Sequence, residues 1–166
     1  MIKEARVFAR GIESGEYGLK EYFRRLRSLP RVIKSKDLPW EKGPVSWNKW
    51  LVQPGQGGMQ SLAAHLIELA PGGHSGKHGH QNEALFYVLD GKGHDIHDGK
   101  RYNWKAGDVL VIHNQCVHQH FNDDPLRPAR ILVIKAKPLY MFMHLIFQGA
   151  VESAPKEPVG YQPAGY

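Results

Sequence analysis

Short apolar runs separated by turn-forming residues dominate the middle of this chain. We expect strands at residues 61–69, 78–80, 84–89, 94–97, 101–104, 109–112, 118–121 and 130–136. Asp98 and Gly99 mark a hairpin turn between two of these runs. Many short strands at regular spacing predict an all-β sandwich or barrel rather than alternating βαβ units.

The residues before this β-region have a different pattern. Between Tyr17 and Leu29, apolar residues recur every three or four positions with Lys and Arg between them. This spacing predicts an amphipathic helix, which Pro30 ends. Residues 39–50 hold three tryptophans among Pro and Gly, a composition more typical of packing or interface anchors than of a ligand platform.

The composition divides the chain into three parts. We expect an N-terminal arm with a helix and a Trp-rich segment at residues 1–58, a barrel at 59–137, and a C-terminal segment with a flexible tail at 138–166. Past Ala150 the chain is rich in Pro, Gly, Glu and Ala, which predicts a poorly ordered tail or one lying over a neighbouring subunit. Exposed strand edges and the Trp-rich segment need cover, so we expect a homodimer.

Composition and charge narrow the choice of partners. The net charge of +6 comes from 22 basic and 16 acidic side chains, which are scattered, so a solvated surface is favoured over a nucleic-acid interface. This charge would help to attract an anionic small-molecule substrate. The single cysteine, Cys116, excludes an internal disulfide framework and is typical of a cytoplasmic protein. We expect no membrane partner, because no apolar run is long enough to span a bilayer.

The histidines are concentrated in one stretch. Eight of the ten lie between Gly72 and Asn122. His78 and His80 are two residues apart on one predicted strand, and positions 118 and 120 repeat this spacing on another. Residues i and i+2 of a strand point to the same face, so two neighbouring strands would direct these imidazoles into one pocket. Such a cluster suits a divalent transition metal.

Two strand-turn-strand units resemble the two motifs of the cupin family. The matching residues are Gly72, His78, His80 and Gly91 in the first motif, and Gly107, Asp108, His118 and Asn122 in the second. The resemblance implies a cupin fold, a double-stranded β-helix or jelly-roll barrel, here with an N-terminal helical arm. It also implies that His78, His80 and His118 bind a metal ion.

The chain departs from the usual cupin pattern at the first motif. Where cupins commonly carry a metal-binding Glu, this chain has Ala84, and Glu83 is one residue away, so strand alternation should turn its side chain outward. In the second motif, His113 and Gln115 stand where Pro and Gly are usual. The missing Glu and the His-x-His-x-Asn ending resemble the gentisate 1,2-dioxygenase group of three-histidine cupin dioxygenases.

This resemblance implies a mononuclear non-haem Fe(II) dioxygenase that uses O2 to cleave a C–C bond of a small hydroxylated aromatic acid, gentisate- or catechol-like, or of a diketone acid. Gentisate dioxygenases are usually longer chains with two cupin units, so the substrate itself is not carried over. Two alternatives remain. One is a lyase or isomerase in which Zn(II), Mn(II) or Ni(II) acts as a Lewis acid, and the other is a cupin that binds a metal or a small ligand without catalysis.

The remaining candidates have competing interpretations. His120 is either an acid–base catalytic residue or a hydrogen-bonded pocket histidine. We place His65, Trp104 and Phe121 at the substrate pocket, although a core role fits His65 as well. Cys116 is interpreted as an inert small hydrophobe. Four further histidines are expected to be surface or hydrogen-bonding residues: His74, His94, His97 and His113.

Overall fold

The computed structural model describes residues 20–43, 45–54, 58–156 and 160–164. The chain forms two compact units, Met1–Val32 and Ile33–Tyr166. In the first unit, helix α2 spans Lys20–Ser28, and basic residues in its last turn complement the helix dipole. The predicted helix began at Tyr17, and its first three residues lie outside the described residues, as does the N-terminal part of the arm up to residue 19.

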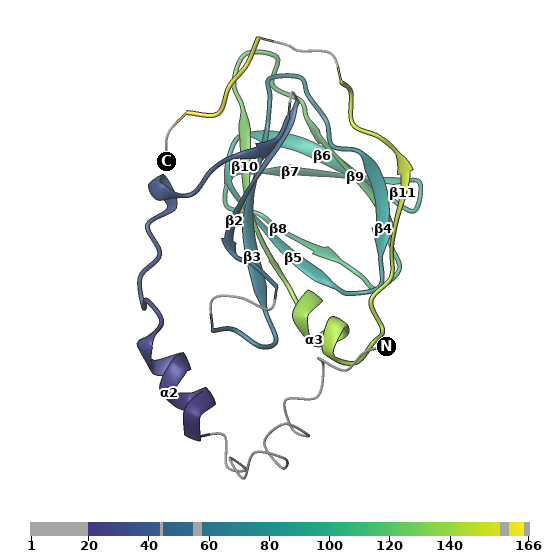
Figure 1. The fold of residues 1–166 in the computed structure, drawn as a ribbon. Helices are drawn as coiled ribbons and strands as arrows, with labels where there is room; N and C mark the ends of the chain where they lie inside the picture. Colours follow the sequence, from purple (N-terminus) through teal and green to yellow (C-terminus); the bar gives the residue numbers. More distant parts are fainter. Residues whose placement is uncertain (1–19, 44, 55–57, 157–159, 165–166) are drawn as a thin grey trace. The chain divides into compact units, whose positions relative to one another are not determined.

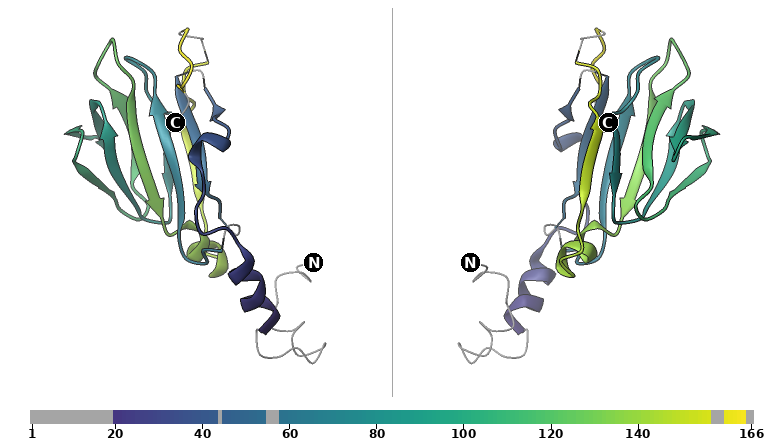
Figure 2. Two further views of the ribbon diagram at one scale, coloured as in Figure 1. Left: turned by 90° about the vertical axis from the view of Figure 1, so that its left-hand side faces the viewer. Right: turned by 90° about the vertical axis from the view of Figure 1, so that its right-hand side faces the viewer.

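The second unit is built from two antiparallel sheets that face each other (Figure 1). The six-stranded sheet has the order β1 (Glu41–Lys42), β2 (Ser46–Val52), β3 (Ala63–Leu69), β10 (Ala129–Lys135), β5 (Ala84–Asp90) and β8 (Val109–Ile112). The five-stranded sheet has the order β11 (Gln148–Glu152), β4 (Lys77–His80), β9 (Val117–Asn122), β6 (Lys92–His97) and β7 (Lys100–Lys105). The side views in Figure 2 show the barrel strands running alongside one another. The all-β prediction is confirmed.

Short helical turns complete the second unit: the 3-10 helix Ser35–Asp37 and helix α3, Lys137–Phe142, which lies at one end of the barrel (Figure 1). The predicted hairpin between β6 and β7 is present. Its turn residues Asp98 and Gly99 have φ values of 47° and 83°, as the tight turn of an Asp-Gly hairpin requires.

The sheets extend beyond the expected barrel limits of 59–137. Strand β2 comes from the Trp-rich segment and pairs with β3, and β11 from the C-terminal segment pairs with β4. The strand at residues 46–52 was not predicted, because we interpreted the tryptophans of this segment only as packing or interface anchors. Packing is nevertheless present, since Trp50 lies against His65 with ring centroids 4.7 Å apart.

The interior of the barrel is apolar along the six-stranded sheet. On β5, residues Ala84, Phe86 and Val88 are buried, whereas the residues between them are exposed. Ile131 and Val133 of β10 belong to the same core cluster. Complete burial of side chains of this size stabilises the fold by about 1.5–3 kcal/mol each, so this cluster is the main support of the barrel.

The C-terminal segment lies against its own chain. The hydroxyl of Tyr161 donates a hydrogen bond to Glu68, a fully buried carboxylate on the outer face of β3. Arg130 on the neighbouring strand β10 forms an ion pair with the same carboxylate. Tyr161 thus contacts its own chain, because the burial of Glu68 requires hydrogen-bond partners, which Tyr161 and Arg130 supply.

Candidate metal centre

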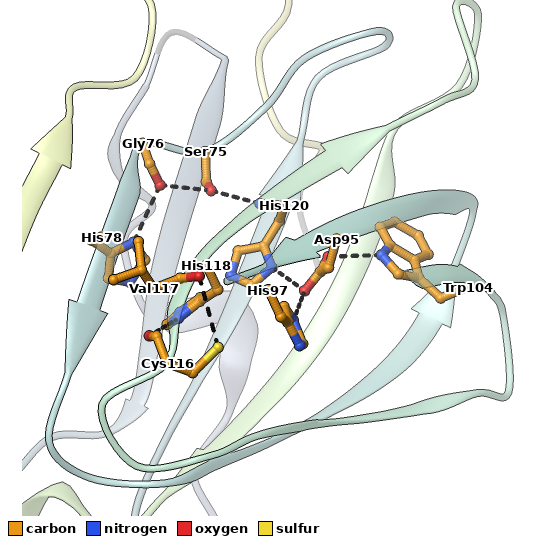
Figure 3. A network of polar contacts seen from close by, with 10 residues as sticks. All are labelled: Ser75, Gly76, His78, Asp95, His97, Trp104, Cys116, Val117, His118 and His120. Carbon is orange, nitrogen blue, oxygen red and sulfur yellow. Dashed lines mark hydrogen bonds and ion pairs between the residues drawn. The ribbon is translucent and has the colours of Figure 1, made fainter. Parts of the chain in front are cut away.

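Strand pairing brings the predicted metal ligands together. Strands β4 and β9 are neighbours, and His78 lies directly opposite His118. The side chain of His80 points to the same face as that of His78, because the two residues are separated by one position. One ring nitrogen from each of these three histidines lies within 4.8 Å of the others (Figure 3 shows His78 and His118). The described residues thus contain the expected three-histidine cluster.

Backbone carbonyls fix the tautomer of all three imidazoles. The Nδ1 atom of His78 is 3.2 Å from the oxygen of Gly76, that of His80 is 2.6 Å from the oxygen of Asn82, and that of His118 is 3.0 Å from the oxygen of Cys116. A carbonyl oxygen only accepts, so each Nδ1 carries the proton and each Nε2 keeps its lone pair. This arrangement is typical of histidines that bind a metal through Nε2.

The surroundings keep these histidines uncharged. Burial, reinforced by neighbouring histidines, lowers the pKa of His118 to about 2 and that of His78 to about 4. Burial also lowers the pKa of His80. The Nε2 atom of His118 is buried and makes no hydrogen bond to any described residue. A buried, unprotonated nitrogen without a hydrogen-bond donor is a good fit for a metal ion.

The first motif contributes no carboxylate to this cluster. Ala84 is buried in the apolar core, and the exposed side chain of Glu83 instead accepts a hydrogen bond of 2.8 Å from the hydroxyl of Tyr140. The cluster formed by described residues contains neither Asp nor Glu. As expected, Glu83 turns away from the histidine cluster, and the candidate donor set consists of three neutral nitrogens.

His120 lies beside the cluster in a second polar network. Its Nδ1 donates to Oδ2 of Asp95 over 2.7 Å, and Asp95 also accepts hydrogen bonds from Nε2 of His97 at 3.0 Å and from Nε1 of Trp104 at 2.8 Å (Figure 3). Burial would raise the pKa of Asp95, but the electrostatic attraction of the His120 ring and these three hydrogen bonds lower it below its ordinary value. Asp95 is thus held as a carboxylate that orients the His120 ring.

The sequence analysis did not identify Asp95, and it gave His97 no role at the site beyond that of a surface or hydrogen-bonding residue. Both lie on β6, where Asp95 pairs directly with His120 and His97 with His118. Their spacing of two residues signals a shared face, but only the pairing of β6 with β9 reveals that this face is the one carrying the histidines. His97 does hydrogen-bond, as expected, and its ring centroid is 6.1 Å from that of His118.

The three predicted pocket residues have different positions. Trp104 is buried at the network described above. His65 is buried on the inner face of the six-stranded sheet, in the cross-strand row that also contains Phe86, whose ring is 4.7 Å from that of His120. The predicted position of Phe121 at the pocket is wrong. Phe121 follows His120 on β9 and therefore points to the outer face, where its ring stacks on that of His94 with centroids 4.5 Å apart.

The turn before β9 accommodates the departures from the second motif. Gln115, which replaces the usual Gly, has a φ of 65° in the left-handed region, and its N–H donates to the oxygen of His80 over 2.9 Å. Next to it, burial and the nearby Asp98 carboxylate raise the pKa of the Cys116 thiol to about 11. The thiol therefore stays protonated at neutral pH, in keeping with the interpretation of Cys116 as unreactive.

Comparison with known proteins identifies the class of fold. Residues 65–135 match the family model described as cupin domain. A 66-residue segment is 32% identical to the 5-aminosalicylate 1,2-dioxygenase of a Comamonas species, covering 40% of this chain and 18% of that protein. Residues 65–135 of the barrel thus match a cupin domain and contain the three-histidine cluster, and part of the chain is similar to a 1,2-dioxygenase of which it spans less than a fifth.

Solved structures show the same fold. The gentisate adduct of salicylate 1,2-dioxygenase from Pseudoaminobacter salicylatoxidans superimposes with a TM-score of 0.61 at 16% identity, covering 79% of this chain and 36% of that one. The polyketide cyclase RemF from Streptomyces resistomycificus gives a TM-score of 0.56 at 19% identity, covering 64% of this chain and 79% of that one.

None of the described helices has the length and apolar character needed to cross a bilayer.

Proposed function

We propose that this protein is a mononuclear non-haem Fe(II) dioxygenase that cleaves a C–C bond of a small hydroxylated aromatic acid. The observation that carries the proposal is the candidate donor set of three neutral histidines, of which His80 and His118 are buried and His78 is half-buried, without a carboxylate. When bound, Fe(II) would supply a site for O2 and for two oxygens of the substrate, and would exchange electrons with both. The partial homology to an aminosalicylate dioxygenase supports the same reaction class.

The charge of the site favours an anionic substrate. Three neutral imidazoles carry no charge that would balance the double positive charge of a divalent ion. Glu83 of the first motif does not balance it either, because its carboxylate accepts a hydrogen bond from Tyr140. A hydroxy-carboxylate or an enolised diketone acid would bring the matching negative charge and two oxygens. His78, His80 and His118 would hold the ion, which would supply further coordination positions for the substrate oxygens.

His120 is placed to take a proton from the substrate. In the neutral form of the ring that donates from Nδ1 to Asp95, Nε2 carries the lone pair, and that Nε2 is buried without a hydrogen-bond partner among the described residues. A phenolic hydroxyl bound next to the cluster would donate its proton there, and Asp95 would stabilise the resulting imidazolium. Phe86 packs against the His120 ring and limits the access of water.

Anaerobic loading of the full chain with Fe(II), followed by oxygen-electrode measurements, tests this proposal. Gentisate, salicylate, 5-aminosalicylate, catechols and β-diketone acids form the substrate panel. We expect stoichiometric O2 consumption with at least one hydroxylated aromatic acid and ring-opened product by mass spectrometry. Iron-loaded protein that consumes no O2 with any member of the panel would refute the dioxygenase assignment.

Metal identity separates the main proposal from its alternative. Three imidazoles also suit Zn(II), Mn(II) or Ni(II), which would support a lyase or isomerase through Lewis-acid chemistry alone. The similarly sized polyketide cyclase shares the barrel fold. Metal analysis of freshly purified protein should find iron, and turnover with Zn(II) in the absence of O2 would favour the alternative.

A homodimer and a cytoplasmic location remain part of the proposal. The outer face of β5 and β8 exposes apolar side chains, with Tyr87 40% and Val111 54% exposed. Cross-strand pairs place these residues on one surface next to an edge strand, a pattern that favours burial against a second copy. Sedimentation analysis of the purified chain should give twice the mass of the monomer.

A further inference from the structure

A cavity of about 560 Å³ lies between β7 and β8, the last strands of the two sheets. On one side it is lined by Lys100, Tyr102 and Trp104, which alternate along the inner face of β7. On the other side it is lined by Leu110 and by Cys116 before β9. Its volume falls in the range of ~300–1,000 Å³ that is typical of small-molecule sites, so an aromatic ring with its substituents fits.

A row of cross-strand partners runs from the candidate metal centre to the strand that lines the cavity. His118 on β9 pairs with His97 on β6, and His97 pairs with Lys100 on β7. Neighbouring strands are about 4.8 Å apart, which places the backbone of Lys100 roughly 10 Å from that of His118. His97 lines the cavity, and its ring centroid lies 5.2 Å from that of Tyr102. The cavity therefore begins one strand beyond the metal-binding histidines.

Lys100 gives this cavity an available positive charge. Two carboxylates also line it, but Asp98 accepts the N–H of Val117 at 2.9 Å, and Asp108 accepts the N–H of Lys105 at 2.9 Å. In the described part of the chain, Lys100 forms no ion pair. An ammonium group beside an aromatic and aliphatic wall matches a ligand that carries a carboxylate on an aromatic ring.

We propose that this cavity binds the aromatic carboxylate ligand of the protein, with the Lys100 ammonium on the carboxylate and the ring between Tyr102 and Leu110. The identification of this ligand as the substrate rests on the proposed dioxygenase function, whereas the binding site itself does not. Lys100 would hold the acid on its way to the metal centre, and His97 would stand between the two. Aromatic acids would then be preferred over uncharged phenols before any metal contact is made.

Isothermal titration calorimetry of the full chain with salicylate tests the binding site directly. The titration uses metal-free protein and protein loaded with redox-inert Zn(II), so that binding in the cavity is measured with and without chelation. We expect salicylate to bind metal-free protein, and Lys100→Ala to weaken this binding about fivefold, as is typical for loss of a partly exposed ion pair. Lys100→Glu should weaken it further, because it replaces attraction by repulsion.

Two controls separate charge recognition from a general effect. Lys105→Ala removes a lysine of the same strand whose side chain alternates to the other face, and should leave salicylate affinity unchanged. Salicylamide, which lacks the carboxylate, should bind wild-type and Lys100→Ala protein equally. Tyr102 is 48% exposed, so the Tyr102→Ala variant should fold. It should weaken the binding of salicylate and of salicylamide to the same degree.

The outcomes distinguish this proposal from the dioxygenase assignment. Equal salicylate affinity in wild-type, Lys100→Ala and Lys105→Ala protein, or no binding to metal-free protein, would overturn the cavity proposal. If Fe(II)-loaded protein consumes no O2 but salicylate binding depends on Lys100, the cavity stands and the dioxygenase assignment falls. If O2 is consumed with the same KM in wild-type and Lys100→Ala protein, the dioxygenase assignment stands and the cavity proposal falls.

Discussion

The two sheets of the barrel present opposite chemistry to the same interior. The inner face of the six-stranded sheet is almost entirely apolar, with Ile67, Ile131 and Val133 at its centre. The inner face of the five-stranded sheet holds the three candidate metal-binding histidines together with His120 and Asp95. One wall thus supplies most of the hydrophobic stabilisation, while the other carries the polar groups that a reaction needs.

The polar wall is stable because each of its groups is held by a partner. The protonated ring nitrogens of the three candidate ligands donate to backbone carbonyls, and Asp95 accepts three hydrogen bonds. Hydrogen bonding offsets the free energy lost when these groups leave water. On this wall the described residues leave two buried ring nitrogens without a hydrogen bond, Nε2 of His118 and Nε2 of His120, which are the atoms proposed to contact the metal and the substrate.

The largest effect on folding should come from the apolar wall. Ile131→Ala should lower the free energy of unfolding by about 2–5 kcal/mol, because it leaves a cavity among fully buried side chains. Leu85→Ala, on the outer face of the same sheet, should have a much smaller effect, since Leu85 is 42% exposed. Urea denaturation measures both, and equal losses would contradict the division between the two faces.

On the polar wall, Asp95→Asn should lower the rate of turnover. An asparagine cannot accept from His120, His97 and Trp104 together, so the His120 ring would lose its fixed orientation. We expect the rate of O2 consumption to fall about 10- to 100-fold while the metal content is kept.

Asp123→Asn is the matched control for that variant. Asp123 accepts from Nδ1 of His94 at 2.8 Å, so it forms a similar pair on the outer face of the same sheet. Its substitution should leave the rate unchanged. An equal loss of activity in both variants would show that the effect is structural and not specific to His120.

Acid should destabilise the polar wall selectively. In the folded protein, the pKa values of His78 and His118 are about 4 and about 2, below the ordinary value of 6.5 that applies to the unfolded chain. Below pH 6.5 the unfolded state therefore takes up protons that the folded state does not, and the free energy of unfolding falls as the pH decreases towards 4. Each histidine contributes up to about 1.4 kcal/mol per pH unit.

Urea denaturation of metal-free protein between pH 7 and pH 4.5 measures this dependence. His118→Ala should reduce its slope, because one of the histidines with a lowered pKa is removed. A slope that is identical in wild-type and variant protein would contradict the buried, neutral state of His118.

The smallest predicted effect concerns the turn that supports the polar wall. Gln115 adopts a φ of 65°, which is unfavourable for a residue with a Cβ atom. Gln115→Gly should raise the free energy of unfolding by about 0.5–1 kcal/mol, whereas Gln115→Ala should leave it unchanged. A glycine variant that is less stable than the wild type would mean that the Gln115 side chain itself stabilises the turn.

Strand alternation predicted much of the site from the sequence. It placed His78 and His80 on one face of their strand, placed His118 and His120 on one face of theirs, and turned Glu83 away, because the period of two residues is a local property of a strand. The choice of His78, His80 and His118 as metal ligands came from the resemblance to cupins. The same rule applied to Phe121 would have placed it outside the barrel, so that error was one of application. Asp95 could not be found in this way, because its role depends on the pairing of β6 with β9.

The limits of the barrel were harder to predict for a similar reason. Strands β2 and β11 join the sheets through partners distant in sequence, and neither has a strong pattern of alternating apolar residues. Tyr161 reaches Glu68 across 93 positions, a contact that composition alone does not reveal. Local periodicity therefore gave the elements, and the tertiary pairings supplied their neighbours.

Metal binding by two histidine variants tests the central assignment most directly. The wild-type chain should bind one divalent ion, His118→Ala should lose it, and His120→Ala should retain it, as measured by elemental analysis after dialysis against a defined Fe(II) or Zn(II) buffer. Equal retention of metal in the two variants would contradict the assignment of His78, His80 and His118 as the ligands.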